Sequence, residues 1–190
     1  MPLTPATLTP VLVANLFSTG NIGPGVTQYA TGVANGVCVH FTSNIKVTTV
    51  DAGSLGVGTG ILPFLVAQPL LLTSLLSGFT MGGILGVMAP PLALGLANGL
   101  AVGLLSGFIK TNHPGIGTGA GIARLTGSTA VPAMINGFKA AGMKGSGPEK
   151  KARAIGLGLD LVTASFLMTI PIVGSASPAA GAGVGIGSIV

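Results

Sequence analysis

Hydrophobic residues recur at spacings of three and four positions in three separate parts of the chain. The segments are TPVLVANLFSTG (residues 9 to 20), QPLLLTSLLSGFTMGG (68 to 83) and VPAMINGFKAAG (131 to 142). This spacing is typical of an amphipathic helix, so each segment predicts a helix of about ten to fourteen residues. Pro10, Pro69 and Pro132 suit the first turn of these helices, where no amide donor is needed.

A glycine follows each predicted helix and marks its end. Gly20, Gly83 and Gly142 stand where the C-terminus of a helix favours a left-handed residue. We therefore expect these three glycines to be helix-ending turns.

A second helix is predicted after each turn, over residues 26 to 42, 90 to 109 and 149 to 169. Each carries small residues four positions apart, although a glycine inside a helix costs about 1 kcal/mol relative to alanine. Close packing against another helix is the expected compensation. The residues expected to pack closely are Gly32, Gly36, Gly95, Gly99, Ala154 and Gly158.

Residues 43 to 60, 111 to 131 and 170 to 190 are expected to be extended or looping arms. The first contains IKVTTVDAGSL, whose β-branched residues predict a short strand, and the arms carry the runs GVGTG, GIGTG and GVGIG. Alternating glycines are too flexible to hold a strand alone. Another backbone should therefore lie against each arm, and we expect each glycine at a shared offset to mark such a close approach.

The pattern is threefold when Gly20, Gly83 and Gly142 are aligned, and a period of about sixty residues indicates a duplicated unit. The sequence thus predicts a mainly α protein of three tandem helix-hairpin repeats with glycine-rich extended arms between them. The predicted repeats are residues 1–60, 61–127 and 128–190, joined in one continuous body.

Charged residues make up only 6 % of the chain and hydrophobic ones 48 %. A monomer in water needs more solvated groups than this to cover its surface. We therefore expect lipid or other protein subunits to surround much of the chain.

Most of the net charge of +5 lies in one segment. Two interpretations remain open for it: a solvated turn between two helices, or a contact patch for an anionic lipid, nucleic acid or acidic protein. The candidate patch consists of Lys139, Lys144, Lys150, Lys151 and Arg153, opposed only by Glu149.

Few residues could carry chemistry. GFKAAGMKG has the gap of a phosphate-binding loop, but Met143 occupies the lysine position, and GIGTGA follows no predicted strand. The chain has two histidines, one cysteine and three acids, so we expect no catalytic site, no metal site and no cofactor. Cys38 is expected in the core, and Asp160 as a helix-end or interface partner.

A membrane protein is the alternative class. Residues 61 to 109 contain no charge, which is long enough for two spans. Glycine and proline pairs interrupt the stretch, the matching parts of the other two repeats are more polar, and there is no Trp to form an aromatic belt.

The start MPLTPATLTPVLVANLFSTG, the nearly chargeless Gly/Ala-rich body and the runs LANGLAVG and GIGTG resemble small structural proteins in the virions of large tailed phages. The resemblance implies a tail, baseplate or neck component that contacts copies of itself and other virion proteins. With no secretory signal visible, we expect synthesis in the host cytoplasm and incorporation into the virion. Nucleic acid is not expected as a principal partner, and a membrane only in the alternative class.

Overall fold

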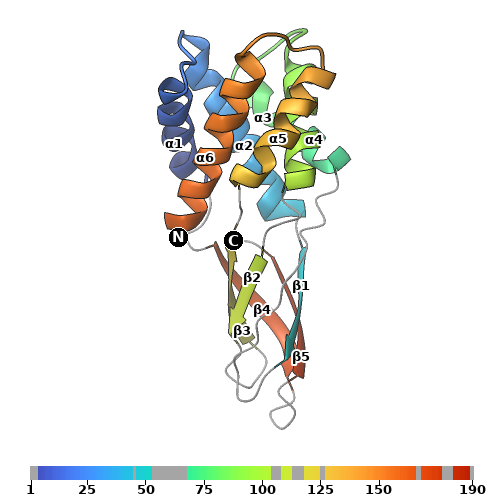
Figure 1. Ribbon diagram of the computed structural model, residues 1–190. Helices are drawn as coiled ribbons and strands as arrows, with labels where there is room; N and C mark the ends of the chain where they lie inside the picture. The colour runs from blue at the N-terminus through green and yellow to red at the C-terminus, as the bar shows by residue number, and fades with distance from the viewer. Residues whose placement is uncertain are drawn as a thin grey trace.

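The computed structural model describes residues 4–44, 46–52, 68–103, 108–112, 118–124, 127–165, 168–176 and 182–188. The chain is mainly helical. Six helices form a bundle at one end of an elongated molecule, and a β-sheet lies at the other end (Figure 1).

The helices are arranged as three consecutive hairpins. The first helices of the hairpins are α1 (Pro5–Ser18), α3 (Gln68–Met81) and α5 (Gly127–Ala140). Their partners are α2 (Gly25–Asn44), α4 (Ala89–Gly103) and α6 (Gly147–Ser165). The three turns between paired helices, which we call the tips (residues 19–24, 82–88 and 141–146), lie at the end of the bundle away from the sheet (Figure 1).

The hairpins are joined in a closed cycle. The second helix of each hairpin packs on the first helix of the next: α2 on α3, α4 on α5, and α6 back on α1. We call these three contacts the seams. Because the last helix closes against the first, the six helices form a complete ring.

The first and second helices of the hairpins differ in how much of their surface is buried. α1 buries one stripe, made of Leu8, Leu12 and Leu16 at intervals of four residues, as expected for a helix that covers a core from outside. The second helices are buried on several faces. Positions that match between them are Val33, Leu96 and Ile155, each with no exposed surface and all members of one core cluster.

The sheet is antiparallel throughout, with strand order β1-β5-β4-β3-β2. Its strands are β1 (Lys46–Ala52), β2 (Phe108–Asn112), β3 (Thr118–Arg124), β4 (Met168–Ala176) and β5 (Ala182–Ser188). β5 lies between β1 and β4, so Gly185 faces Thr49 on one side and Gly174 on the other. The alternating glycines of β5 are thus part of a strand that is paired with another backbone on both sides.

Several predicted boundaries were wrong. α4 ends at Gly103 rather than 109, and β2 occupies Phe108 and Ile109; α6 ends at Ser165 rather than 169, and β4 begins at Met168. Between α6 and β4 the sequence has no Gly or Pro to mark the change, whereas Gly103 and Gly107 stand at the boundary between α4 and β2. Residues 127–131, predicted as part of an arm, are the first turn of α5. Residues 53–60 of the first arm lie outside the described residues.

Two of the three predicted proline starts were also wrong. Pro10 and Pro132 lie inside α1 and α5, and only Pro69, the second residue of α3, is in a first turn. α1 starts earlier because Thr4 caps it. The Thr7 N–H donates to the Thr4 side chain and the Thr4 N–H donates to the Thr7 side chain, which is a capping box, and Pro5 takes the first position.

Candidate functional site

Glycines form the first seam, between α2 and α3. A methyl group placed on Gly32 would lie 2.5 Å from the Phe79 ring, and one on Gly36 would lie 2.6 Å from the Leu75 Cα. Across the seam, Gly78 faces the backbone of both. Carbon atoms do not approach so closely, so the two helices are in backbone contact that only glycine allows.

The second seam, between α4 and α5, repeats this arrangement. A methyl group on Gly95 would lie 2.5 Å from the Phe138 ring, and one on Gly99 would overlap the backbone of Met134. Gly137 faces Gly95 from α5, as Gly78 faces Gly32 and Gly36 from α3.

The third seam, between α6 and α1, is built differently. Ala154, fully buried, takes the place of a glycine, and Asn15 stands in α1 where α3 and α5 have Gly78 and Gly137. Gly158 remains, and a methyl group there would lie 2.6 Å from the Leu12 side chain rather than from a backbone atom. Side chains therefore separate the helices of this seam.

The turn glycines end the helices in one common way. Gly20, Gly83 and Gly142 have φ of 81°, 78° and 88°, in the region that favours glycine. In each case the following residue donates its N–H to a carbonyl five positions earlier: Asn21 to Leu16, Ile84 to Phe79 and Met143 to Phe138. This pattern is the Schellman motif.

The expectation that every shared glycine marks a close approach between backbones is wrong at the tips. Nothing lies within 4 Å of a methyl group built on Gly23, Gly86, Gly142 or Gly145. These four glycines have positive φ, so the backbone conformation and not the available space requires them.

The tips of the first two hairpins expose large apolar side chains. Ile22 is 84 % exposed at the first tip, and Leu85 and Val87 are 72 % and 88 % exposed at the second. Met81 and Met88 add to the second tip. The third tip carries Lys144 where the other two carry Ile22 and Leu85.

The basic segment is divided among different settings. Lys139 and Lys144 are exposed at the end of α5 and in the third tip. Arg153 forms an ion pair with Glu149, with Nη2 2.6 Å from Oε1. Lys150 and Lys151 face the first hairpin instead: the Lys150 Nζ would lie 3.4 Å from a methyl group on Gly20, and the Lys151 Nζ donates to Asn21 Oδ1 at 3.3 Å. Lys150 and Lys151 of the candidate patch are therefore turned toward the first hairpin, and Arg153 is paired with Glu149.

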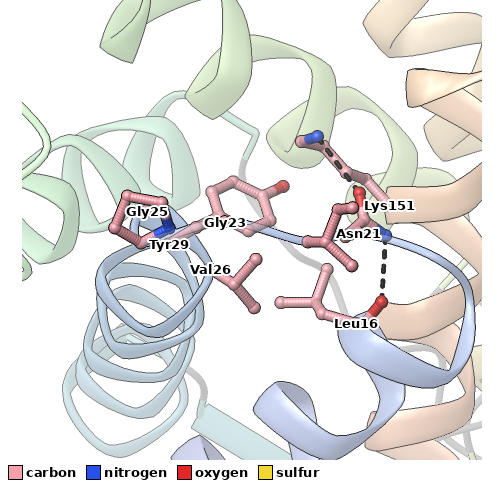
Figure 2. Close-up of a pocket in the computed structure, with 9 residues that line it drawn as sticks. Leu16, Asn21, Gly23, Gly25, Val26, Tyr29 and Lys151 are labelled. Carbon is pink, nitrogen blue, oxygen red and sulfur yellow. Dashed lines mark hydrogen bonds between the residues drawn. The ribbon is translucent and has the colours of Figure 1, made fainter.

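A cavity of about 260 Å³ lies where the first tip meets α6. Figure 2 shows the Tyr29 hydroxyl and the Lys151 ammonium group turned toward Asn21 inside it. The Lys151 Nζ is 5.7 Å from the centre of the Tyr29 ring. The cavity is lined by Leu16, Asn21, Ile22, Gly23, Pro24, Gly25, Val26, Tyr29 and Lys151.

Hydrogen bonds hold the Asn21 side chain in one orientation. Its Nδ2 donates to the Leu16 carbonyl at 3.3 Å and to the Thr19 hydroxyl at 3.1 Å. The Oδ1 is therefore left to face Lys151.

Burial shifts the pKa of both ionisable groups in the cavity. Loss of solvation raises the pKa of the Tyr29 phenol far above its ordinary value. Loss of solvation, followed by the nearby Lys150 charge, lowers the pKa of Lys151. Both shifts favour the neutral form of the side chain: the phenol of Tyr29 and the amine of Lys151.

Tyr29 and Asn21 were not among the residues predicted to form a site. One signal was available: Tyr29, Leu92 and Lys151 stand at the same position in α2, α4 and α6, nine residues after Gly20, Gly83 and Gly142. Because α6 packs on α1, Lys151 comes to lie beside the first hairpin.

Cys38 and Asp160 do not line this cavity. Cys38 is a free thiol, 2 % exposed, as expected for a core residue. Asp160 accepts a hydrogen bond from the Ser128 amide at 3.0 Å, at the beginning of α5. Within the described residues, no three His, Cys, Asp or Glu side chains are grouped so as to hold a metal ion. Among the same residues, none of the helices has both the length and the apolar character needed to cross a membrane.

Comparison with family models, with curated proteins and with solved structures finds no match to this chain.

Proposed function

We propose that the chain is a non-enzymatic structural subunit of a large multi-chain assembly, a virion component of a phage tail, baseplate or neck. Its uncharged faces would be buried against copies of itself and other virion proteins. Support comes from the near absence of charge and from the resemblance to small virion proteins.

We further propose that the three hairpins are repeats of one unit of about sixty residues, with the strands as glycine-rich arms. At each of the three seams, the second helix of one hairpin packs on the first helix of the next. The strands follow the same order: the second strand of one arm pairs with the first strand of the next, β3 with β4 and β5 with β1. A duplicated unit explains both facts at once.

The observation that carries the assembly proposal is the exposed apolar surface at the tips. Leu85 and Val87 are both highly exposed. Folded proteins in water rarely expose large aliphatic side chains close to one another. Met81 and Met88, which are close to them in the sequence, are exposed as well and add to the apolar surface of the second hairpin. Such a surface is typical of a protein–protein contact.

Sedimentation of the purified chain tests this proposal. The wild-type chain should form species larger than a monomer, and Leu85→Glu with Val87→Glu should shift the population toward monomers. Thr80→Glu is the matched control, because Thr80 is exposed on the same hairpin and is polar already. A wild-type chain that stays monomeric at high concentration would contradict the proposal.

The same apolar tip favours one second candidate, a membrane-penetrating protein that inserts the second hairpin. Apolar side chains at the end of a helical bundle can enter the boundary between headgroups and acyl chains. Flotation with lipid vesicles separates the two candidates: binding that survives a carbonate wash and is lost in the double Glu variant favours the membrane.

A further inference from the structure

The cavity between the first tip and α6 combines three kinds of hydrogen-bond donor. Lys151 contributes an ammonium group, Tyr29 a phenol, and the start of α2 its backbone amides. One acceptor in the same space, Asn21 Oδ1, already accepts a hydrogen bond from Lys151.

The positive charge at the cavity is not neutralised by any described residue. Lys150 lies beside Gly20 and Lys151 in the cavity wall, while the nearest acid in sequence, Glu149, is engaged with Arg153. No described carboxylate pairs with Lys151. Two adjacent ammonium groups that partly lose solvation repel each other and are stabilised by an anion.

Tyr29 adds a second and independent indication. Its side chain is 5 % exposed, and its hydroxyl finds no hydrogen-bond partner among the described residues. A buried hydroxyl without a partner costs roughly 1 to 3 kcal/mol. The hydroxyl faces the cavity next to Lys151 (Figure 2), so an acceptor placed there would satisfy it.

The beginning of α2 supplies the third indication. α2 has twenty residues, and its first turn presents amides at the positive end of the helix dipole, although the Val26 N–H already donates to the Gly23 carbonyl at 3.3 Å. Pro24, which precedes it, has no side-chain oxygen that could cap these amides. Gly23, Pro24 and Gly25 all line the cavity, so the helix start is next to the other two donors.

We propose that this cavity binds a small anionic group, a carboxylate or a phosphate, between Lys151, Tyr29 and the first turn of α2. Lys151 supplies the charge, Tyr29 donates its hydroxyl proton to one oxygen of the ligand, and the α2 amides bind another. Leu16 and Val26, both buried, form the apolar part of the wall, and low local polarity strengthens such contacts. A volume of about 260 Å³ leaves room for such a group with several waters, at roughly 30 Å³ each.

This proposal does not depend on assembly, because the cavity is formed within one chain. The test can therefore use the Leu85→Glu, Val87→Glu variant, which keeps every residue of the cavity. If that variant fails to bind anions, only the anion site is contradicted. If the wild-type chain is monomeric, only the assembly proposal is contradicted.

Tyr29 can serve as an optical probe of the cavity, because it is the one tyrosine of the chain and the chain has no tryptophan. Tyrosine fluorescence and ultraviolet difference absorption therefore come from the site alone. Titration with inorganic phosphate, and separately with acetate, should give a saturable change in this signal. Sodium chloride at equal ionic strength is the reference.

Lys151→Met should weaken the binding at least tenfold, and Lys151→Arg should restore most of it. Lys139→Met is the matched control, since Lys139 is exposed on the same hairpin and does not line the cavity. Tyr29→Phe removes the optical signal, so its binding is measured by the shift of the thermal midpoint with phosphate, which should be smaller than in the wild type.

Each outcome of the titrations supports or overturns the proposed anion site. A response to phosphate alone assigns the site to phosphate groups, and a response to acetate alone assigns it to carboxylates. Responses to both salts that are no larger than the response to sodium chloride overturn the proposal. A loss in Lys139→Met equal to that in Lys151→Met also overturns it, because the segment's diffuse charge would then be the cause.

Discussion

Gly99 of α4 lies against Met134 of α5 with no room for a single methyl group between them. Gly99→Ala should therefore force the second seam apart. Overpacking of this kind costs about 1 to 3 kcal/mol, and the backbone of Met134 cannot move as a flexible side chain would. Chemical denaturation should show a lower free energy of unfolding by about that amount.

Gly147→Ala is the control for this substitution. Gly147 begins α6 and has nothing within 4 Å of a methyl group. Alanine is the better helix former by up to about 1 kcal/mol, so this variant should be as stable as the wild type or more so. Equal losses in both variants would refute a specific close contact at Gly99.

Substitution of Gly142 tests whether the turn between α5 and α6 requires a residue with positive φ. At φ of 88°, a β-branched side chain is strained, and Gly142→Val should cost about 1 to 2 kcal/mol of stability. Gly142→Asn should cost less, because asparagine tolerates this region. Thermal melting of the two variants compares them, and equal melting temperatures would mean that the turn does not need its left-handed residue.

Tyr29 predicts the response to alkali. Because burial raises its pKa in the folded chain, only the unfolded chain ionises near pH 10, and folding loses about 1.4 kcal/mol per pH unit above that value. Phenolate absorption should therefore appear together with unfolding and not before it. A smooth titration near pH 10 in a chain that keeps its helical circular dichroism would show that Tyr29 is solvated.

Cys38 should be slow to react with thiol reagents. Burial raises the pKa of the Cys38 thiol to about 12, so little thiolate exists at pH 8, and the side chain is 2 % exposed. Modification of the folded chain should be at least a hundredfold slower than in denaturant. Destabilised variants such as Gly99→Ala should react faster, in proportion to how often the bundle opens.

Lys151 should destabilise the chain when no anion is bound. Its pKa is lowered on folding, so the folded state binds the proton less well than the unfolded state does. Stability therefore rises as the pH increases from below the lowered pKa toward the unfolded value near 10.4. Lys151→Met should be more stable than the wild type at neutral pH, with a difference that shrinks in alkali. Denaturation of both proteins at several pH values measures this.

The sequence predicted the hairpins because their signals are local. Spacing at three and four residues and a glycine at each helix end depend on neighbours in the chain, as Leu12, Leu16 and Gly20 illustrate. The cavity could not be predicted in this way. It depends on Tyr29 and Lys151, 122 positions apart, which meet only because α6 closes on α1.

The strands show the same limit. Thr49 pairs with Gly185 across most of the chain, and no local pattern specifies that pairing. The end of α6 was misplaced for a different reason, since Met168 continues an apolar run that has no Gly or Pro at the boundary. At the end of α4, Gly103 and Gly107 were a local signal for the boundary.

The closed ring has a consequence for how its positions can vary. A ring built from three separate, identical chains would carry one side chain three times wherever a position repeats. Here a single chain completes the cycle, so Tyr29, Leu92 and Lys151 can differ although each stands nine residues after the glycine of its turn. Because the three hairpins belong to one chain, a residue in one hairpin can change without changing the matching residues in the other two. An exact homotrimer could not place a phenol and an ammonium group at matching positions.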